Sequence, residues 1–443
     1  MSERNQVGVR TQRLLPFWQL GLLGLVFASP GLAAAAEAQT EPLTGAPDAM
    51  VGGESKGEGA GVDEPMAQRP DTSGGAYTWQ FLYKADLVSV HARNLSSRAA
   101  LLGNLDAKLS IDGEKAWGIG GATIFLHALS AHGGKPNERL GSTMGIDNIE
   151  VGTATAKLYQ AYWAQDLAAG KFNLLGGLYD LNSEFYVTDS ASSLIHPSFG
   201  IGAEAGLSGQ NGPSIFPTTS LAVRATWKPA SDWYAQLAVM DGVPGDTERP
   251  RGTHIKFARG DGALWAGEVG TRFGKEGQDG KLAAGAWRYT ARFNDLSEVD
   301  GNGDPLRRVS QGAYLLGEHR LYQAPDHAER SLSGFLRVGM ANGQVNTLDR
   351  NISAGLLFRG ICPLRLEDSL VFGVSHGRYG THLRDAQHAA GDPAPTAEMA
   401  YELTYRAVIN KWLTLQPDLQ WIRTRGDSGA HALVAGLRME FSF

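Results

Sequence analysis

Apolar and polar residues alternate with a period of two along most of the chain from Tyr77 onward. In the final segment, Leu433, Leu437 and Phe441 fall on one face, whereas Arg438 falls on the other. Successive side chains of a β-strand point to opposite sides, so this period predicts strands whose two faces meet different surroundings. The pattern therefore predicts an all-β fold.

The alternating segments give about sixteen strand candidates, and bacterial single-chain membrane barrels have an even number of strands. The expected ranges are 77–92, 99–110, 116–129, 154–165, 171–179, 219–228, 232–241, 263–273, 281–291, 311–322, 331–341, 350–359, 366–377, 398–410, 412–423 and 431–443.

Short and long connections alternate between these candidates. The long ones are 130–153, 180–218, 242–262, 292–310 and 378–397, and each follows an odd-numbered strand. Outer-membrane barrels have short periplasmic turns and longer external loops. We therefore predict that residues 77–443 form a transmembrane antiparallel β-barrel of about 16 strands, with both ends of the barrel chain in the periplasm.

A soluble β-sandwich would also give a period of two. Sixteen strands exceed one sandwich domain, and aromatic residues gather near the strand ends, as the interfacial girdles of membrane barrels do. The girdle candidates are Trp79, Trp163, Trp227, Trp233, Tyr401, Trp412 and Trp421. These positions favour the barrel over the sandwich.

The first 76 residues differ in composition from the rest. Three arginines precede an apolar stretch at 14–27, and small residues follow at 33–38, so we expect residues 1–38 to be a signal peptide. A membrane anchor is the alternative, but Gln19 interrupts the stretch, which is shorter than the roughly 20 residues of a spanning helix. Residues 39–76 are rich in Gly, Pro and Glu with few large apolar side chains, and we expect a disordered periplasmic leader.

Charge and motif content narrow the chemistry. The net charge of −6 leaves no basic footprint for nucleic acid. The single cysteine, Cys362, cannot form an intramolecular disulfide. A calcium-loop pattern begins at Asp300 but fails at Pro305 and Gln311. No HExxH or CxxC motif is present, so the sequence predicts no metal, no cofactor and no catalytic residue.

Several long motifs carry a family resemblance. They read GLYDLNSEFYVTDSA at 177–191, SFGIG at 198–202, SGQNGPSIFP at 208–217, VMDGVPGD at 239–246 and GDGAL at 260–264. Weaker matches are DGEKAWG at 112–118, QAYWAQ at 160–165 and LQPDLQWI at 415–422. In these motifs the chain resembles the OprB-type carbohydrate-selective porin family, over about Tyr77 to Phe443.

The resemblance implies a sixteen-stranded outer-membrane barrel that favours sugars, with the loop 181–218 folded inward as a constriction. The loop is also too apolar to lie in water. Charged groups and aromatic faces suit sugars, and strand parity supplies inward candidates. The expected channel-lining residues are Arg224, Glu268, Arg272, Arg288, Glu318 and Arg320 on strands, Asp180, Asn182 and Glu184 at the loop root, and Tyr179, Tyr186 and Tyr234. For each of these, a structural salt bridge or a solvated lumen position stays an equal alternative.

The expected function is passive transport of mono- or small oligosaccharides across the outer membrane into the periplasm. The alternatives are a general or ion-selective porin of the same fold and an outer-membrane barrel enzyme such as a lipase. Expected partners are small sugars, outer-membrane lipid and the barrel-assembly machinery, which would read the C-terminal strand ending in Phe443. The sequence leaves open whether the barrel is a monomer or a homo-oligomer.

Overall fold

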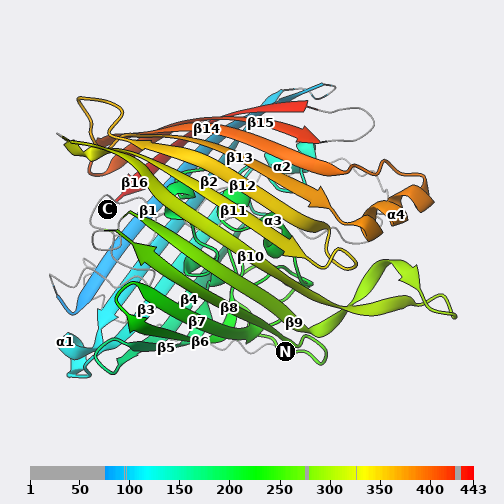
Figure 1. Cartoon of the computed structure of the whole chain (residues 1–443), viewed down its shortest axis with the longest axis horizontal. Coiled ribbons are helices and arrows are strands. Elements are labelled where there is room, and N and C mark those ends of the chain that lie inside the picture. Colours follow the sequence, from blue (N-terminus) through cyan, green and yellow to red (C-terminus); the bar gives the residue numbers. More distant parts are fainter. Residues whose placement is uncertain (1–74, 94, 96, 275–278, 326, 425–430) are drawn as a thin grey trace, which may run out of the picture. The chain divides into compact units, whose positions relative to one another are not determined.

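Sixteen antiparallel strands close into one barrel, in which β1 pairs with β16 (Figure 1). The computed structural model describes residues 75–443 except 94, 96, 275–278, 326 and 425–430. The strands are β1 (Tyr77–Ala92), β2 (Arg98–Asp112), β3 (Ala122–Gly133), β4 (Thr155–Leu167), β5 (Phe172–Tyr179), β6 (Ser220–Ala230), β7 (Trp233–Asp241), β8 (Ala263–Phe273), β9 (Gly280–Val299), β10 (Pro305–Ala324), β11 (His327–Ala341), β12 (Leu348–Arg359), β13 (Ser369–Tyr379), β14 (Ala397–Asn410), β15 (Leu413–Thr424) and β16 (His431–Ser442). The predicted sixteen-stranded barrel is confirmed.

The period of two in the sequence becomes an inside and an outside of the wall. In β1, Asp86 and Val88 are buried toward the interior, while Leu87 between them is 46% exposed on the outer surface. Cross-strand neighbours share a face, and Asp86 lies opposite Arg438 of β16. All six tryptophans of the predicted girdles are exposed near strand ends, as aromatic belts at the two membrane interfaces are.

Short helices occupy the connections. They are α1 (Gly113–Trp117), α2 (Pro136–Leu140), the 3-10 turns η1 (Leu181–Ser183), η2 (Asp189–Ala191) and η3 (Pro197–Phe199), α3 (Ala203–Gly206) and α4 (Thr381–Ala390). Figure 1 shows α1 at one end of the barrel, and α4 with the tips of β9 and β10 at the other. None of the helices in the described part of the chain has the length and apolarity to cross a membrane.

Two predicted boundaries are wrong. The expected loop 292–310 is mostly strand, because β9 and β10 continue past the wall as a hairpin whose connection is only 300–304. The sequence of this extension has no continuous apolar face, and Asp295 and Ser310 within it are buried polar residues. The strand expected from 116 begins at Ala122, because α1 follows Asp112, whose side chain accepts hydrogen bonds from the backbone N–H groups of Glu114 and Lys115.

The expected signal peptide, residues 1–38, lies outside the described residues, as does the expected leader 39–76 except for Gly75 and Ala76. Inside the barrel, the segment between β5 and β6 forms a core with the wall. Phe185, Ile201 and Ile215 of this segment pack in one buried cluster with Tyr289 of β9 and Tyr314 of β10. The predicted inward fold of the long loop is therefore present in the structure.

Gly177 of β5 tests how closely the strands pack. Its φ is +144°, and an added Cβ would lie 2.6 Å from the Cα of Tyr162 and still closer to the carbonyl oxygen of Ala161. We expect Gly177→Ala to lower the free energy of unfolding by about 2 kcal/mol or more, because backbone atoms of β4 have to move. The measurement is urea unfolding of the refolded protein in lipid vesicles.

The adjacent Gly176 is the matched control, since an added Cβ there meets nothing within 4 Å. We expect Gly176→Ala to unfold at the wild-type urea concentration. Equal unfolding midpoints for the two variants would contradict the close approach of β4 to Gly177.

Candidate functional site

The segment 180–219, called here the constriction loop, starts from a capped turn at the end of β5. The carboxylate of Asp180 accepts a hydrogen bond from the backbone N–H of Asn182 at 2.8 Å and another from the hydroxyl of Tyr159 at 2.7 Å. The Ser183 hydroxyl donates to the Asp180 carbonyl at 2.6 Å. These local bonds turn the chain away from the strand direction and into the barrel.

Three inward-facing glutamates of the wall, called here the wall carboxylates, hold the backbone of the constriction loop. Glu268 of β8 accepts from the N–H of Tyr186 at 2.9 Å. Glu318 of β10 accepts from the N–H and the hydroxyl of Ser190, both at 2.8 Å. Glu402 of β14 accepts from the N–H of Ile195 at 2.5 Å and from that of His196. Three different strands therefore supply side-chain acceptors to the backbone of the loop.

Cations of the wall bind the same loop from other strands. Arg224 of β6 makes two parallel bonds to Glu184, each 2.7 Å long. Arg337 of β11 donates to the carbonyl oxygens of Ser198 and Gly200, at 2.5 and 3.1 Å. Lys281 of β9 donates to the carbonyl oxygen of Val187 at 3.0 Å. The loop is therefore fastened on several sides of the barrel.

Aromatic residues complete the contact around Glu268. The hydroxyls of Tyr234 and Tyr314 donate to its carboxylate at 2.7 and 2.6 Å. Tyr186 of the loop stacks on Tyr314 with ring centres 3.8 Å apart, and its hydroxyl donates to Glu204 at 3.0 Å. Tyr186 has a φ of +62°, which is uncommon for a residue with a side chain and depends on these surrounding contacts.

A second inward segment, 134–154, is held in the same way. Glu398 of β14 accepts from the hydroxyl of Ser142 at 2.6 Å and from the N–H of Met144 at 3.0 Å. Gln420 of β15 donates to the Ile146 carbonyl oxygen at 2.9 Å. The wall therefore holds two long segments, and each adds to the narrowing of the interior.

Most of the predicted channel-lining residues meet at the constriction loop. They are almost fully buried, and their polar atoms contact the loop or its root; they are Tyr179, Asp180, Asn182, Glu184, Tyr186, Arg224, Tyr234, Glu268 and Glu318. Their placement fits the structural alternative, which the sequence left open for each of them.

Arg272 and Arg320 keep access to the interior. The side chain of Arg272 is 15% exposed and lies 3.2 Å from Asp189 of the constriction loop, whose own side chain is 37% exposed. Arg320 is 26% exposed and pairs with Asp279 beside the β8–β9 connection. Among the predicted residues, Arg272 and Arg320 are therefore the inward-facing side chains that remain partly exposed.

The prediction that Arg288 faces inward is wrong. Its neighbour Tyr289 is buried and bonds the constriction loop through Ser208, so Arg288 points away from the interior. Its cross-strand neighbour Trp265 is likewise exposed on the outer surface. An arginine costs little free energy at this position, because charged side chains are tolerated far better at a membrane interface than at the bilayer midplane.

Sequence reasoning missed Glu402, Arg337 and Asp189. Glu402 and Arg337 fall on inward faces by parity, and that signal could have added them to the candidates. Parity could not reveal which loop groups they bind. Asp189 lies in the loop, where no strand period applies.

Glu268→Gln tests the fastening of the constriction loop. The variant keeps the side-chain volume but weakens the acceptor that receives four donors, from Tyr186, Tyr234, Gln236 and Tyr314, at a local cost of about 1–3 kcal/mol. We expect a folded barrel with a larger and noisier single-channel conductance in planar lipid bilayers. Glu114→Gln, in the exposed helix α1, is the matched control, and a wild-type trace from Glu268→Gln would contradict the fastening role.

Glu204 gives the constriction loop a pH dependence. Burial raises the pKa of Glu204 to about 7, above the ordinary value of 4.5. The protonated Glu204 raises the free energy of unfolding, and this contribution is fully present below pH 4.5. It is lost as the pH rises through about 7, a change on the order of 3 kcal/mol. Burial has the opposite effect on His196: it lowers the pKa of the imidazole to about 3, so His196 stays neutral across the pH range in which Glu204 titrates.

We therefore expect wild-type conductance to rise between pH 6.5 and 8, as ionised Glu204 loosens the loop. Glu204→Gln should remove most of this rise, because the amide does not titrate. Single-channel recordings at both pH values check this, and an equal pH response in the two proteins would show that another group is responsible.

Known proteins share both the sequence pattern and the barrel. Residues 96–443 match the family described as carbohydrate-selective porin, OprB family. Porin B of Pseudomonas aeruginosa is 24% identical over 253 residues, which cover 52% of this chain and 56% of that protein. The aligned part thus spans little more than half of the curated relative.

Solved structures show the same fold at low identity. The high-pH structure of Pseudomonas putida OprB superposes with a TM-score of 0.74 at 19% identity, covering 83% of this chain and 94% of that one. The outer membrane channel DcaP of Acinetobacter baumannii gives 0.52 at 11% identity over 83% of this chain and 97% of its own. The barrel crosses the outer membrane with its sixteen strands, and the chain belongs to the OprB family of carbohydrate-selective porins.

Proposed function

We propose that the protein is a passive channel that carries mono- or small oligosaccharides across the outer membrane into the periplasm. The observation that carries the proposal is a constriction loop held inside the barrel, with the pair Asp189 and Arg272 accessible at its edge. A carboxylate and a guanidinium side by side offer an acceptor and several donors to sugar hydroxyls. The family match and the fold support the same assignment.

The mixed sign of these groups argues against a purely ion-selective porin. Rings of one charge sign are what select ions in a pore. Here Arg272 meets Asp189, and Arg320 meets Asp279, so each accessible cation lies beside an anion. Neutral polar solutes gain hydrogen bonds from such pairs, whereas an ion of either sign gains little net attraction.

His196 and Ser198 of the constriction loop give little support to the enzyme alternative. Nδ1 of His196 lies 2.9 Å from the Ser198 hydroxyl, but both side chains are fully buried. Glu402 bonds the backbone N–H of His196 and not its ring, so no carboxylate orients the imidazole through this contact. A hydrolytic triad needs that orientation and an accessible nucleophile.

The chain end also fits barrel assembly. Phe443 is 78% exposed, and its backbone exchanges hydrogen bonds with Phe81 of β1 at 2.9 and 3.3 Å. β16 is thus the last strand of the barrel and forms the closing seam with β1. We include in the proposal that the barrel-assembly machinery reads this strand before the seam closes.

Liposome swelling tests the transport proposal. Vesicles with the refolded protein are diluted into isotonic solutions of monosaccharides, disaccharides and amino acids of matched size. We expect sugars to enter faster than amino acids of similar size. Asp189→Asn with Arg272→Gln should reduce the sugar rate by roughly twofold to tenfold, because each hydrogen bond contributes about 0.5–1.5 kcal/mol.

The exposed pair Glu114→Gln and Lys115→Gln in α1 serves as the matched control and should leave all rates unchanged. Rates set by solute size alone, equal in wild type and variant, would reduce the function to general diffusion. Faster passage of one charge sign would favour the ion-selective porin.

A further inference from the structure

Three arginines follow one another along β9 and β10 on the outer surface of the barrel, at the end that carries the long loops. Arg288 and Arg292 of β9 and Arg307 of β10 are all exposed, and none belongs to the interior face. Arg292 donates to the carbonyl oxygen of Arg307 at 3.1 Å, and Arg307 donates back to the carbonyl oxygen of Arg292. Each guanidinium group is therefore held against the backbone of the neighbouring strand.

These arginines have no acidic partner within the described chain. Arg288 donates to the neutral side chain of Gln311 at 3.2 Å, and Arg307 donates to that of Asn294 at 2.9 Å. The nearby carboxylates of Asp295 and Glu298 pair instead with Arg308. Like charges held together without an anion repel each other, so the cluster is suited to an external anion.

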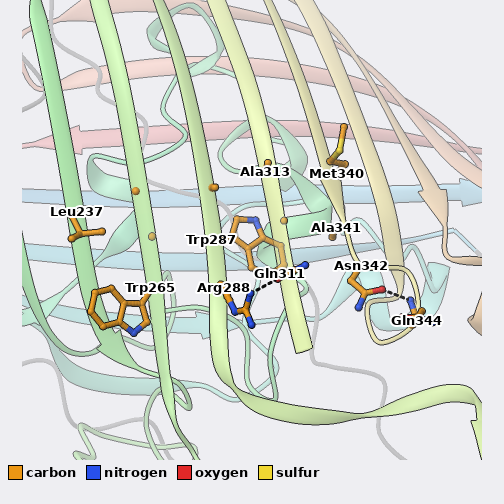
Figure 2. A pocket seen from close by; sticks show the side chains of 14 residues that line it. Leu237, Trp265, Trp287, Arg288, Gln311, Ala313, Met340, Ala341, Asn342 and Gln344 are labelled. Carbon is orange, nitrogen blue, oxygen red and sulfur yellow. Dashed lines mark hydrogen bonds between the residues drawn. The ribbon is translucent and has the colours of Figure 1, made fainter. Parts of the chain in front are cut away.

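An apolar groove adjoins the cluster on the same outer surface (Figure 2). Figure 2 shows Trp265 and Leu237 on one side of Arg288 and Met340 on the other. Small residues at Gly267, Ala286 and Ala313 hollow the wall between them. The groove has a volume of about 820 Å³.

The arginines stand at the membrane interface. Trp265 pairs with Arg288, and Phe273, eight residues further along β8, is exposed near the opposite end. Eight residues of a tilted strand cover roughly 20 Å across a membrane, close to the apolar height of such barrels. Arg288 therefore lies at the level of lipid headgroups, while the apolar groove runs among the acyl chains.

We propose that this surface binds a phosphorylated lipid of the outer leaflet, of the lipid A type. Its phosphates bind Arg288, Arg292 and Arg307, and an acyl chain occupies the groove between Trp265 and Met340. Basic clusters at a membrane surface bind anionic headgroups, and guanidinium groups match phosphate oxygens in geometry.

Charge complementarity favours this lipid over a second copy of the chain. Arg350 and Arg423 also face outward near this end of the membrane-spanning strands, whereas Arg378 beside them is paired with Asp349. A second copy that packed through the same surface would therefore place its arginines against these arginines, and the like charges would repel. A phosphorylated leaflet instead supplies anions to the arginines that have no carboxylate beside them.

Native mass spectrometry of the refolded full chain in detergent tests the proposal. Diphosphoryl lipid A is titrated against wild type and against a variant with Arg288, Arg292 and Arg307 all changed to Gln. We expect binding of diphosphoryl lipid A to weaken by roughly tenfold or more in the variant. Phosphatidylethanolamine, which has no net charge, should bind weakly to both proteins.

A control variant with Arg251, Arg259 and Lys411 changed to Gln removes the same charge from exposed loops and turns. It should bind lipid A as wild type does. Ala313→Leu, which fills the groove, should weaken lipid A binding while the arginines remain. Equal binding in the triple Arg variant and wild type would overturn the proposal, as would equal losses in the two triple variants. Dimers or trimers lost only in Ala313→Leu would show that a second copy takes the groove.

Discussion

Backbone N–H groups that are carried into a barrel interior, away from any strand partner, have to find acceptors there. The constriction loop carries many such donors, because its short 3-10 turns and α3 satisfy only a few of them locally. Glu268, Glu318 and Glu402 accept hydrogen bonds from several of the others, from three strands of the wall. An unsatisfied buried donor costs about 1–3 kcal/mol, so these carboxylates decide whether the loop stays inside.

This constraint separates two groups of charged residues in the interior. Arg224, Arg337 and the wall carboxylates are almost fully buried and hold the loop. A bidentate pair such as Arg224 with Glu184 fixes geometry, and removing one partner leaves a buried charge uncompensated. Solute selectivity then rests on residues that remain accessible between the anchors, as Asp189 and Arg272 do.

The sequence predicted the barrel well, because the period of two arises from a wall whose strands face lipid on the outside and a polar interior on the inside. It failed at 292–310, where the β9–β10 hairpin extends past the wall and its sequence loses that period. It also misplaced Arg288, which was expected to face inward by strand parity but lies on the outer surface. The interior there is filled by Trp287 and Tyr289, which pack with the constriction loop, and no pattern along one strand shows such a neighbour.

The structure also explains why the anchoring residues could be suspected but not assigned. Parity places Glu268 and Glu402 inside, yet their partners, Tyr186 and Ile195, lie 82 and 207 residues away in the chain. Residues with the same inward parity, such as Arg272, hold a looser position and stay in contact with solvent. What separates an anchor from a pore contact is its depth beneath the loop. This depth depends on the path of the loop in three dimensions. Changes at the accessible edge of the loop, near Asp189, can therefore alter the solute preference while the buried residues that hold the loop stay the same.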